Sequence, residues 1–548
     1  MLLAAAVAGL ALFLWLRAAD DITVRLREPG QDHAPPPATQ TINPALAGQT
    51  IVAPAPATRP GTPSGIAADA GGNSTGNSGG GGGGGIWPQF RGPDRAGFVT
   101  PGDPALGNAH LARTWPATGP RVRWSVALGE GYAGPAVYGG CVYLMDYDER
   151  KAPPTAPGDA LRCLSLATGR EIWRFAYHLK IKRNHGYSRT VPAVTDRYVV
   201  ALGPKCQVIC VDRHTGQLIW TRDLVGEFGA TVPDWYAGQC PLIDGNRVIL
   251  ATGGPGTAPP LSVGGERLGE GPSSSSAKTE NPNSKTPSAP SLLIALDLPT
   301  GHVVWQSPNP DAWRMTHASI MPMDLAGRHT YVYPASGGVV GVDAATGRIL
   351  WSTAAWRISI ATVPSPVILP GNRIFLTGGY DAGSMILDLG SIWPALSPSA
   401  PPVTDRPGEV PSSSKSGIPS PSVALRLKPG LFASTQQTPI FYRDHLWAVR
   451  PDGRFACLNL DGKLAWTSPP GTNFGLGPFL IAGDLIYLMD DNGTLVLAEA
   501  STTRWQELAR AKVLSGTESW APMALVGHRL LVRDSKRMVC LDVGPEGG

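Results

Sequence analysis

The chain has 548 residues, a formal net charge of +4 and only 16% charged residues. It contains no Lys/Arg cluster that could hold a polyphosphate backbone, so nucleic acid is not expected as a partner. The seven cysteines form no C-x-x-C pair, which argues against a zinc ribbon and a thioredoxin-like redox motif. Low-complexity stretches leave about 420 residues to fold, which is large for one compact core and favours a repeat architecture.

The first 19 residues predict a signal peptide or an uncleaved signal-anchor helix. Met1 to Leu16 is apolar throughout and is followed by Arg17. The run is short for a membrane span, which needs about 20 residues. A small-x-small cleavage site at Ala19 is disfavoured, because the large Arg17 lies two positions before it. We expect the bulk of the chain outside the cytoplasm, in the periplasm or cell envelope. It would be anchored to a membrane by this helix or, after cleavage, secreted.

Three low-complexity segments flank or interrupt the patterned sequence. Residues 20–85 are Pro/Ala/Thr-rich and then Gly/Asn/Ser-rich, a composition that cannot bury enough apolar surface to offset the entropy of ordering. They predict a flexible, disordered tether. Residues 255–290 and 391–422 are similar in composition, but the strand pattern resumes unchanged after each. They predict disordered loops inserted between strands.

A recurring phrase predicts the repeating unit of residues 121–548. Its most nearly complete copy, Asp343 to Trp351, reads D-x-x-T-G-x-x-x-W, with apolar alternation before the turn and Ile, Leu and Trp after it. The Gly supplies the positive φ of a hairpin turn, and the alternation has the period of a strand. Another strand pair lies upstream of each phrase, so each unit has four strands, as a propeller blade does. The copies span Cys163–Trp173, Cys210–Trp220, Ala295–Trp305, Gly341–Trp351 and Cys457–Trp466.

The spacing of the phrases predicts eight blades, with seven as the alternative. Turn glycines recur about every 47 residues once the insertions are left out. A degenerate blade with its outer strand near 423–427 fills the gap before Cys457, and Trp505 is expected to mark the outer strand of the blade after Trp466. The last unit ends at 538–543 without its Trp strand. The strand around Trp124 has that pattern and should complete the last blade, which removes an exposed sheet edge.

The repeated Trp and Cys residues are expected to be structural. A Trp beside a turn Gly in each blade predicts stacking between adjacent blades, because aromatic rings bury large areas. Cys163, Cys210, Cys457 and Cys540 occupy equivalent repeat positions, as small buried hydrophobes on a strand would. A disulfide between Cys206 and Cys210 is kept as an alternative, although Cys206 lies where a turn residue is expected.

The D-x-x-T-G-x-x-x-W phrase makes residues 121–543 similar to the PQQ-like repeat propellers, the family of the quinoprotein alcohol dehydrogenases and of the outer-membrane assembly lipoprotein BamB. The resemblance implies an all-β, eight-bladed propeller with four-stranded antiparallel blades. Trp87 to Phe98, WPQFRGPDRAGF, resembles the opening of secreted planctomycete members of this family. Within residues 86–120, Trp87, Phe90 and Arg91 are expected to anchor an arm against one propeller face. A recruitment motif for a partner is the alternative.

The loops that lead into the innermost strands of a propeller converge on its central channel, the default ligand site. Aromatic, cationic and amide groups around one mouth could hold a planar anionic ligand such as a quinone carboxylate. They could equally be rim residues that satisfy one another. The candidate cofactor- or ligand-binding residues are Tyr132, His185, Tyr187, Arg189, Trp235, His317, Gln436 and Trp520, with Gly186, Asp234, Thr362, Asn473 and Glu518 beside them.

The family pattern of a quinoprotein dehydrogenase requires calcium ligands of Glu, Asn and Asp beneath PQQ, a catalytic Asp, and commonly a vicinal Cys-Cys ring. The chain has no adjacent cysteines, no C-x-x-C-H haem site, and no G-x-S-x-G, H-E-x-x-H or P-loop motif. We therefore predict no catalytic residue, no metal site and no cofactor, and leave PQQ with calcium as the alternative.

The leading prediction is a non-catalytic binding or scaffold propeller at the cell envelope. It would be a monomer that holds a protein partner or a small ligand and reaches the membrane through its N-terminal helix. One alternative is a PQQ-dependent oxidoreductase of alcohols or sugars. Another is an assembly factor resembling BamB, although a lipobox cysteine is missing because the first cysteine is Cys141.

Overall fold

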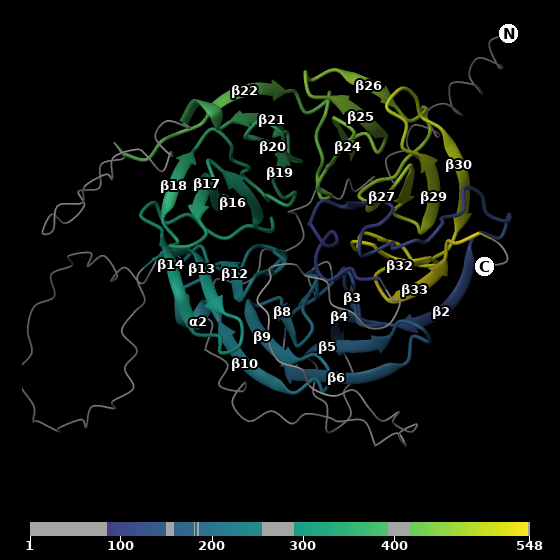
Figure 1. Cartoon of the computed structure of the whole chain (residues 1–548), viewed down its shortest axis with the longest axis horizontal. Helices are drawn as coiled ribbons and strands as arrows, with labels where there is room; N and C mark the ends of the chain where they lie inside the picture. The colour runs from purple at the N-terminus through teal and green to yellow at the C-terminus, as the bar shows by residue number, and fades with distance from the viewer. Residues whose placement is uncertain are drawn as a thin grey trace, which may run out of the picture. The chain divides into compact units, whose positions relative to one another are not determined.

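The computed structural model describes residues 85–148, 158–179, 181–183, 186–254, 290–392 and 417–545. The chain divides into two compact units, residues 1–40 and 41–548. The first unit lies outside the described residues, so the description concerns the second. It contains eight sheets that follow one another as the blades of a propeller (Figure 1). The prediction of an all-β, eight-bladed propeller is confirmed.

Each blade has four antiparallel strands, and in blades 1 to 7 they follow the chain from the innermost to the outermost; blade 8 takes its outermost strand from the N-terminal side, and blade 7 is extended by one short parallel strand. Blades 1 to 4 consist of β3 (Ala136–Tyr138), β4 (Cys141–Asp148), β5 (Gly158–Ser165) and β6 (Glu171–His178); β7 (Ala193–Val194), β8 (Tyr198–Leu202), β9 (Gln207–Asp212) and β10 (Leu218–Asp223); β11 (Leu242–Asp244), β12 (Arg247–Ala251), β13 (Ser291–Asp297) and β14 (Val303–Pro308); and β15 (Met321–Leu325), β16 (Arg328–Ala335), β17 (Gly338–Asp343) and β18 (Ile349–Thr353).

The second half of the ring repeats this arrangement. Blades 5 to 7 consist of β19 (Val367–Leu369), β20 (Arg373–Gly378), β21 (Gly383–Asp388) and β22 (Ser422–Leu427); β23 (Ile440–Tyr442), β24 (His445–Val449), β25 (Phe455–Asn459) and β26 (Leu464–Thr467); and β27 (Phe479–Ala482), β28 (Leu485–Met489), β29 (Thr494–Glu499) and β30 (Glu507–Lys512). Blade 8 contains β31 (Ala524–Val526), β32 (Arg529–Arg533), β33 (Arg537–Asp542) and β2 (Arg121–Ala127).

The first and last strands of the ring close it. β2 pairs antiparallel with β33, and Trp124 lies opposite Cys540. The predicted closure by the N-terminal strand is therefore confirmed, as is the degenerate blade, whose outer strand is β22. The predicted loops 255–290 and 391–422 fall between β12 and β13 and between β21 and β22, and most of their residues lie outside the described ranges.

The recurring phrase joins each blade to the next. In blade 4, Asp343 Oδ1 accepts hydrogen bonds from the amide and the hydroxyl of Thr346, at 2.9 and 2.8 Å, and Gly347 takes a φ of +76°. The Trp of the preceding blade covers this turn: a Cβ built on Gly347 would lie 2.6 Å from the Trp305 ring. The Nε1 of Trp305 donates to Ala344 O at 3.1 Å. The predicted stacking of Trp between blades is confirmed here.

One Trp departs from the prediction. Ala509, not Trp505, occupies the place of the repeat Trp on β30, opposite Leu497. Trp505 lies before the strand because the turn after β29 is long, and its ring packs 5.8 Å from that of Trp466. Assigning Trp505 to the outer strand was therefore wrong in register, although the blade itself is present.

The outer strands carry a shared irregularity that protects their edges. All eight shift register against their neighbour just before the Trp position, as between Leu218 and Trp220. A bulge increases the local twist and makes an edge strand a poorer template for pairing with another chain. Each blade therefore presents a short, interrupted edge to solvent.

The remaining regular elements are short: β1 (Phe98–Val99), α2 (Leu224–Phe228) and the 3-10 turn η3 (Gly390–Ile392). Across the described ranges no helix is both long and apolar enough to cross a membrane. The predicted signal segment, residues 1–19, and the tether up to residue 84 lie outside those ranges.

Candidate functional site

The inner strands all begin on one side of the ring, here called the start face, and reach their first hairpins on the other, the turn face. A proline opens the inner strand in seven blades, which suits a strand start because proline has no amide hydrogen to donate. These prolines are Pro135, Pro192, Pro241, Pro366, Pro439, Pro478 and Pro522. The candidate ligand residues lie just upstream of these positions, on the start face.

Side chains in front of the inner strands join neighbouring blades. The Cys240 amide donates to Ser319 Oγ at 3.0 Å, and the Ser319 amide donates to Ser365 Oγ at 3.0 Å. The Ser365 amide in turn donates to Thr438 Oγ1 at 2.9 Å. Because each amide is satisfied by the next blade, the loops that carry the candidate residues have a fixed spacing around the axis.

Tyr132, Trp520 and Arg189 meet on the start face between blades 8, 1 and 2. The Tyr132 and Trp520 rings stack with centroids 5.2 Å apart. Tyr132 donates its hydroxyl to Glu518 Oε2 at 2.8 Å, and the Arg189 guanidinium lies 5.2 Å from the Tyr132 ring centre. Burial and the Glu518 hydrogen bond raise the pKa of Tyr132 above its usual range. The phenol therefore stays protonated and acts as a donor.

Arg189 links this group to Trp235 and His317. Its Nε donates to the Trp235 carbonyl, and the rings of Trp235 and His317 are 6.3 Å apart. Burial, then the charge of Arg189, lower the pKa of His317 to about 3, so the imidazole is neutral at physiological pH. Burial also lowers the pKa of Arg189, to about 10, which leaves it charged.

The backbone of this cluster is strained at three positions. Trp235, Tyr236 and Glu518 have φ values of +61°, +74° and +60°. Such left-handed conformations in bulky residues cost about 1–3 kcal/mol each and concentrate at sites where geometry serves a function. The strain supports a functional role for this part of the start face.

The other candidates lie around this cluster, and Thr362 contacts it directly. Tyr187 stacks on Tyr147 at 4.0 Å, and the Thr362 carbonyl accepts the His317 amide at 3.0 Å. Gln436 lies across the axis in blade 6. His185 falls outside the described residues.

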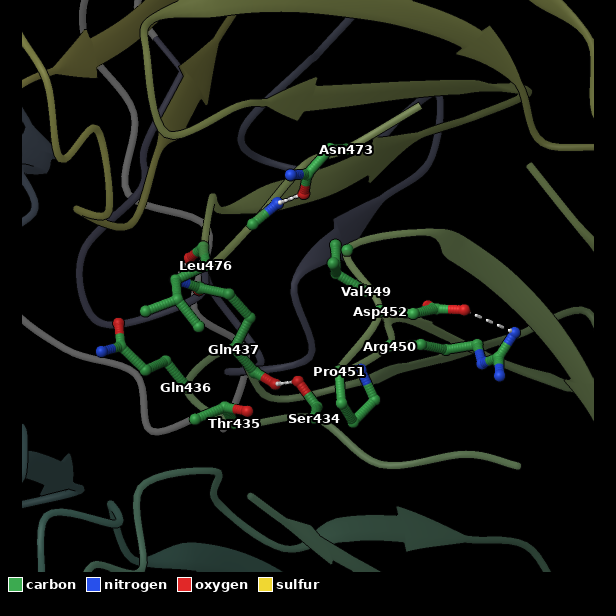
Figure 2. Close-up of a pocket in the computed structure, with 12 residues that line it drawn as sticks. Ser434, Thr435, Gln436, Gln437, Val449, Arg450, Pro451, Asp452, Asn473 and Leu476 are labelled. Carbon is green, nitrogen blue, oxygen red and sulfur yellow. Dashed lines mark hydrogen bonds and ion pairs between the residues drawn. The ribbon is translucent and has the colours of Figure 1, made fainter. Parts of the chain in front are cut away.

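Gln436 and Asn473 line a pocket of about 350 Å³ between blades 6 and 7 (Figure 2). The pocket is formed by residues 434–437 and 449–453 and by Asn473, Gly475 and Leu476. Its charged side chains, Arg450 and Asp452, pair with each other at 3.3 Å, so the lining has no net charge. Within the described ranges the Gln436 side chain makes no hydrogen bond to the protein, so its amide is available to a ligand.

Gln437 connects the pocket to the aromatic cluster, which is formed by Tyr132, Trp520, Trp235 and His317. Its Nε2 donates to Leu476 O at 3.0 Å and to Trp520 O at 3.2 Å. Sequence reasoning missed Gln437, although it lies beside Gln436 in the same loop. It also missed Glu130 and Tyr147, which lie outside the segments just before the inner strands that supplied the candidates. Glu130 pairs with Arg183 at 2.7 Å, which balances the charge beside Tyr132.

The arm before the propeller fills the axis from the turn face. Trp87 exchanges both backbone hydrogen bonds with Val137 of blade 1, and β1 pairs in parallel with β27 of blade 7. Arg95 donates to Cys240 O and Pro241 O, at 3.3 and 3.0 Å, in blade 3. Blades 3 and 7 are opposite each other in an eight-blade ring, yet Arg95 and Phe98 are only three residues apart. The arm therefore crosses the centre.

Arg91 makes the same kind of contact in blade 6. Its guanidinium donates to the Thr438 carbonyl and, at 2.9 Å, to Pro439 O. Burial, then the charge of Arg95, lower the pKa of Arg91 to about 9, and burial lowers the pKa of Arg95 to about 10. Both side chains end on neutral oxygens rather than on carboxylates. The arm thus enters from the turn face, and its two arginines reach the residues at which the inner strands of blades 3 and 6 begin.

The start face does not fit PQQ with calcium. Tyr132 and Trp520 stack directly on each other, which leaves no slot between them for a quinone ring. Three carboxylates there are engaged by protein groups: Glu518 by Tyr132, Glu130 by Arg183 and Asp491 by Trp520. No group of three or more His, Cys, Asp or Glu side chains converges to hold a metal ion anywhere in the described part of the chain.

The family model described as "Outer membrane protein assembly factor BamB" matches residues 157–266 and 288–388. No curated protein matches the chain. Among solved structures, BamB from Moraxella catarrhalis has 14% identity and a TM-score of 0.47, covering 77% of this chain and 97% of its own. The quinohemoprotein alcohol dehydrogenase from Comamonas testosteroni has 13% identity and a TM-score of 0.42, covering 84% and 81%. The family match over blades 1 to 5 supports placing the chain among the PQQ-like repeat propellers.

Proposed function

We propose that this chain is a non-catalytic binding propeller that holds a small ligand or a segment of a partner protein on its start face. The carrying observation is the pocket of about 350 Å³ on the start face, in which the Gln436 side chain makes no hydrogen bond to any described residue. The cluster offers partly exposed apolar rings at Trp235 and Trp520, and the pocket offers amide groups. Recognition sites commonly combine an apolar lining with a few placed polar groups.

The charges favour a neutral ligand over the anionic one considered from the sequence. Arg183 is paired with Glu130, and Arg450 is paired with Asp452. Of the other charges, Arg189 and Glu518 have opposite signs, and Asp491, which accepts from Trp520 Nε1, and the exposed Asp234 are negative and disfavour an anion. A ligand with several hydroxyl or amide groups and an apolar face would satisfy Gln436 and Asn473 without bringing an unpaired charge into the site.

The test is ligand-detected NMR on the full-length protein with two neutral probe sets, disaccharides and blocked tetrapeptides. The proposal expects saturation transfer to members of one set. It expects Gln436→Ala to reduce the transfer at least threefold, because the Gln436 amide makes no hydrogen bond to the described residues and would bond to the ligand instead. Gln217→Ala, an exposed glutamine on the turn face, is the matched control and should change nothing. Absence of transfer to either set, or an equal loss in both variants, would refute the proposal.

A second candidate function is assembly of outer-membrane proteins. The specific observation in its favour is the family match over residues 157–266 and 288–388, whose description names an assembly factor. It would use the same start face to hold a segment of a partner. A strain that lacks the protein should then contain less folded outer-membrane β-barrel protein, and the full-length chain should restore the level.

The proposal includes a location outside the cytoplasm, with residues 1–19 as the export signal or anchor. It is supported by the apolar run up to Leu16 and by the likeness of Trp87–Phe98 to secreted propellers of the planctomycete type. Fractionation of cells that make the full-length chain should place it in the envelope or the medium, and removal of residues 1–19 should leave it in the cytoplasm.

A further inference from the structure

Blade 1 carries a second thiol beside its repeat cysteine. Cys163 lies opposite Trp173, in the same place that Cys210, Cys457 and Cys540 occupy in blades 2, 6 and 8. Cys141 begins β4 and lies opposite Ser165. The residues at the place of Cys141 in those three blades are Tyr198, His445 and Arg529. The other three repeat cysteines therefore provide internal controls that have no second thiol at this position.

The two thiols of blade 1 are neighbours on one face of the sheet. Tyr143 lies opposite Cys163, and Cys141 is two residues before Tyr143, so Cys141 and Cys163 form a diagonal cross-strand pair. Cys163 is fully buried, whereas Cys141 is partly exposed at the strand end. The two thiols are close enough for each to shift the pKa of the other. A solvent-facing thiol thus has a buried thiol directly behind it.

A positive charge from blade 2 faces this pair. Arg213 lies 5.1 Å from the Tyr138 ring centre and donates to the Tyr143 hydroxyl at 3.4 Å. Its other contacts are the Asp196 carbonyl, at 2.7 Å, and the His214 ring, and no carboxylate pairs with it in the described part of the chain. The guanidinium charge is therefore available to stabilise an anion on the strand end of blade 1.

These contacts give the Cys141 thiol a lower pKa than the repeat cysteines have. The hydrogen bond from Cys163, with smaller contributions from the Tyr143 hydroxyl and the Arg213 charge, lowers the pKa of Cys141 to about 6 against the opposing effect of burial. Burial raises the pKa of Cys210, Cys457 and Cys540 to about 12. Only the thiolate is a nucleophile, so one cysteine of this set is prepared to react.

We propose that Cys141 and Cys163 are a redox-active thiol pair, in which Cys141 attacks an external disulfide and Cys163 resolves the product. The Cys141 thiolate attacks one sulfur of the disulfide RSSR, and one RS⁻ leaves. The first RS⁻ takes the proton of Cys163, and the Cys163 thiolate attacks the Cys141 sulfur; the second RS⁻ leaves and is protonated by water. Two protein thiols are oxidised to one disulfide, and RSSR is reduced to two RSH.

Closure of the pair requires a small movement. Diagonal partners in antiparallel strands lie about 7–8 Å apart between Cα atoms, just beyond the roughly 6.8 Å that a disulfide spans. Cys141 directly follows the turn residues Gly139 and Gly140, which have φ values of +57° and +74°. A strand end beside two glycines can shift by about 1 Å more easily than the middle of a strand.

The test treats the full-length protein with oxidised glutathione at pH 7 and maps its cysteines by mass spectrometry. The proposal predicts loss of two hydrogens and a linked Cys141–Cys163 peptide that reductant reverses. In Cys163→Ser the expected product is a lasting glutathione adduct on Cys141. The matched control, Cys457→Ser, should form the Cys141–Cys163 link at the wild-type rate. A wild-type protein that keeps all its thiols, or retains the adduct as Cys163→Ser does, would overturn the proposal.

Alkylation kinetics test the same pair without a core substitution. The rate of iodoacetamide reaction at Cys141 should rise with a midpoint near pH 6, whereas Cys210, Cys457 and Cys540 should stay unmodified in the folded protein. Arg213→Gln should slow alkylation of Cys141 at pH 6 by a few-fold, because removing the charge raises the pKa of the thiol. A midpoint at the usual value for cysteine, or no effect of Arg213→Gln, would contradict the inference.

Discussion

The indole of Trp173 lies directly over Gly216 of the next blade: a Cβ on Gly216 would come within 2.7 Å of the ring, and Trp173 Nε1 donates to Arg213 O at 3.0 Å. The two residues that make the repeat phrase recognisable thus act across a blade boundary. The Gly leaves room for the ring, and the ring covers the turn. The same relation joins Trp124 to Gly169 and Trp220 to Gly301, which explains why the phrase repeats.

Gly216→Ala is expected to destabilise the propeller by about 2 kcal/mol or more, because the new methyl group meets the Trp173 ring and the φ of +71° is unfavourable for alanine. Gly245→Ala is the matched control. Gly245 also has a positive φ, +55°, but has open space around it. The Gly245→Ala protein should therefore lose only about 1 kcal/mol of its free energy of unfolding. Thermal unfolding followed by circular dichroism compares the two, and equal losses would count against the Trp–Gly contact.

Two tryptophans at equivalent places should respond differently to Phe. Trp220 Nε1 donates to Leu298 O at 2.7 Å, whereas the buried Trp351 Nε1 has no partner among the described residues. Trp220→Phe should lower the free energy of unfolding by about 1 kcal/mol or more, since it leaves a buried carbonyl without its donor. Trp351→Phe removes a group that makes no bond and should be close to neutral. Parallel urea titrations measure both, and the reverse order would contradict this account.

Arg91→Ala should loosen the arm. The substitution leaves the carbonyls of Thr438 and Pro439 without their donor in the centre of the ring, where water cannot easily replace it. We expect faster proteolysis between residues 85 and 120 and a lower melting temperature. Arg170→Ala, at an exposed position on a turn, is the control and should behave as wild type. Unchanged proteolysis in Arg91→Ala would show that the arm is held by its backbone contacts alone.

Asp159 predicts a pH-dependent stability. It is fully buried, accepts the Tyr177 hydroxyl at 2.7 Å, and has one oxygen to which no group in the described part of the chain donates. Burial, opposed by the Tyr177 hydrogen bond and supported by the nearby charge of Asp146, raises its pKa from 3.8 to about 7. The folded protein therefore binds this proton more tightly than the unfolded chain does. The resulting stability is complete below about pH 4 and is lost as the pH rises through 7.

Asp159→Asn imitates the protonated form and should stabilise the protein at pH 8 by about 2–4 kcal/mol. The gain should shrink at pH 5, where wild-type Asp159 is already largely protonated. Chemical unfolding at both pH values measures the difference. Asp196→Asn, at an exposed turn of the next blade, should show no such dependence on pH. An equal effect of Asp159→Asn at pH 5 and pH 8 would rule out the raised pKa.

The architecture could be predicted because its main interactions repeat at a fixed interval. The turn Gly, the Trp and the apolar alternation appear in each complete copy of the phrase, so the degenerate blade around β22 and the closure through Trp124 followed from counting. Trp505 was misplaced because a longer turn shifted it out of register, and local sequence does not reveal the length of an irregular turn.

The candidate site could be predicted only in part. Placing Tyr132 and Arg189 at the start of inner strands required only the position within the repeat. The Tyr132–Glu518 hydrogen bond joins residues 386 positions apart, and the contact of Arg95 with Cys240 depends on a chain that crosses the axis. No periodicity encodes such contacts. The separation of Gln436 from the aromatic cluster likewise became evident only from the ring geometry.

The most direct test of the central claim is calorimetric titration of the full-length protein with PQQ, with and without calcium, beside an assay of dye-linked alcohol oxidation. A non-catalytic binding propeller whose start-face rings and carboxylates are engaged with each other predicts no calcium-dependent binding at tens of micromolar and no turnover. Calcium-dependent binding accompanied by turnover would contradict the claim and make the start face an active site.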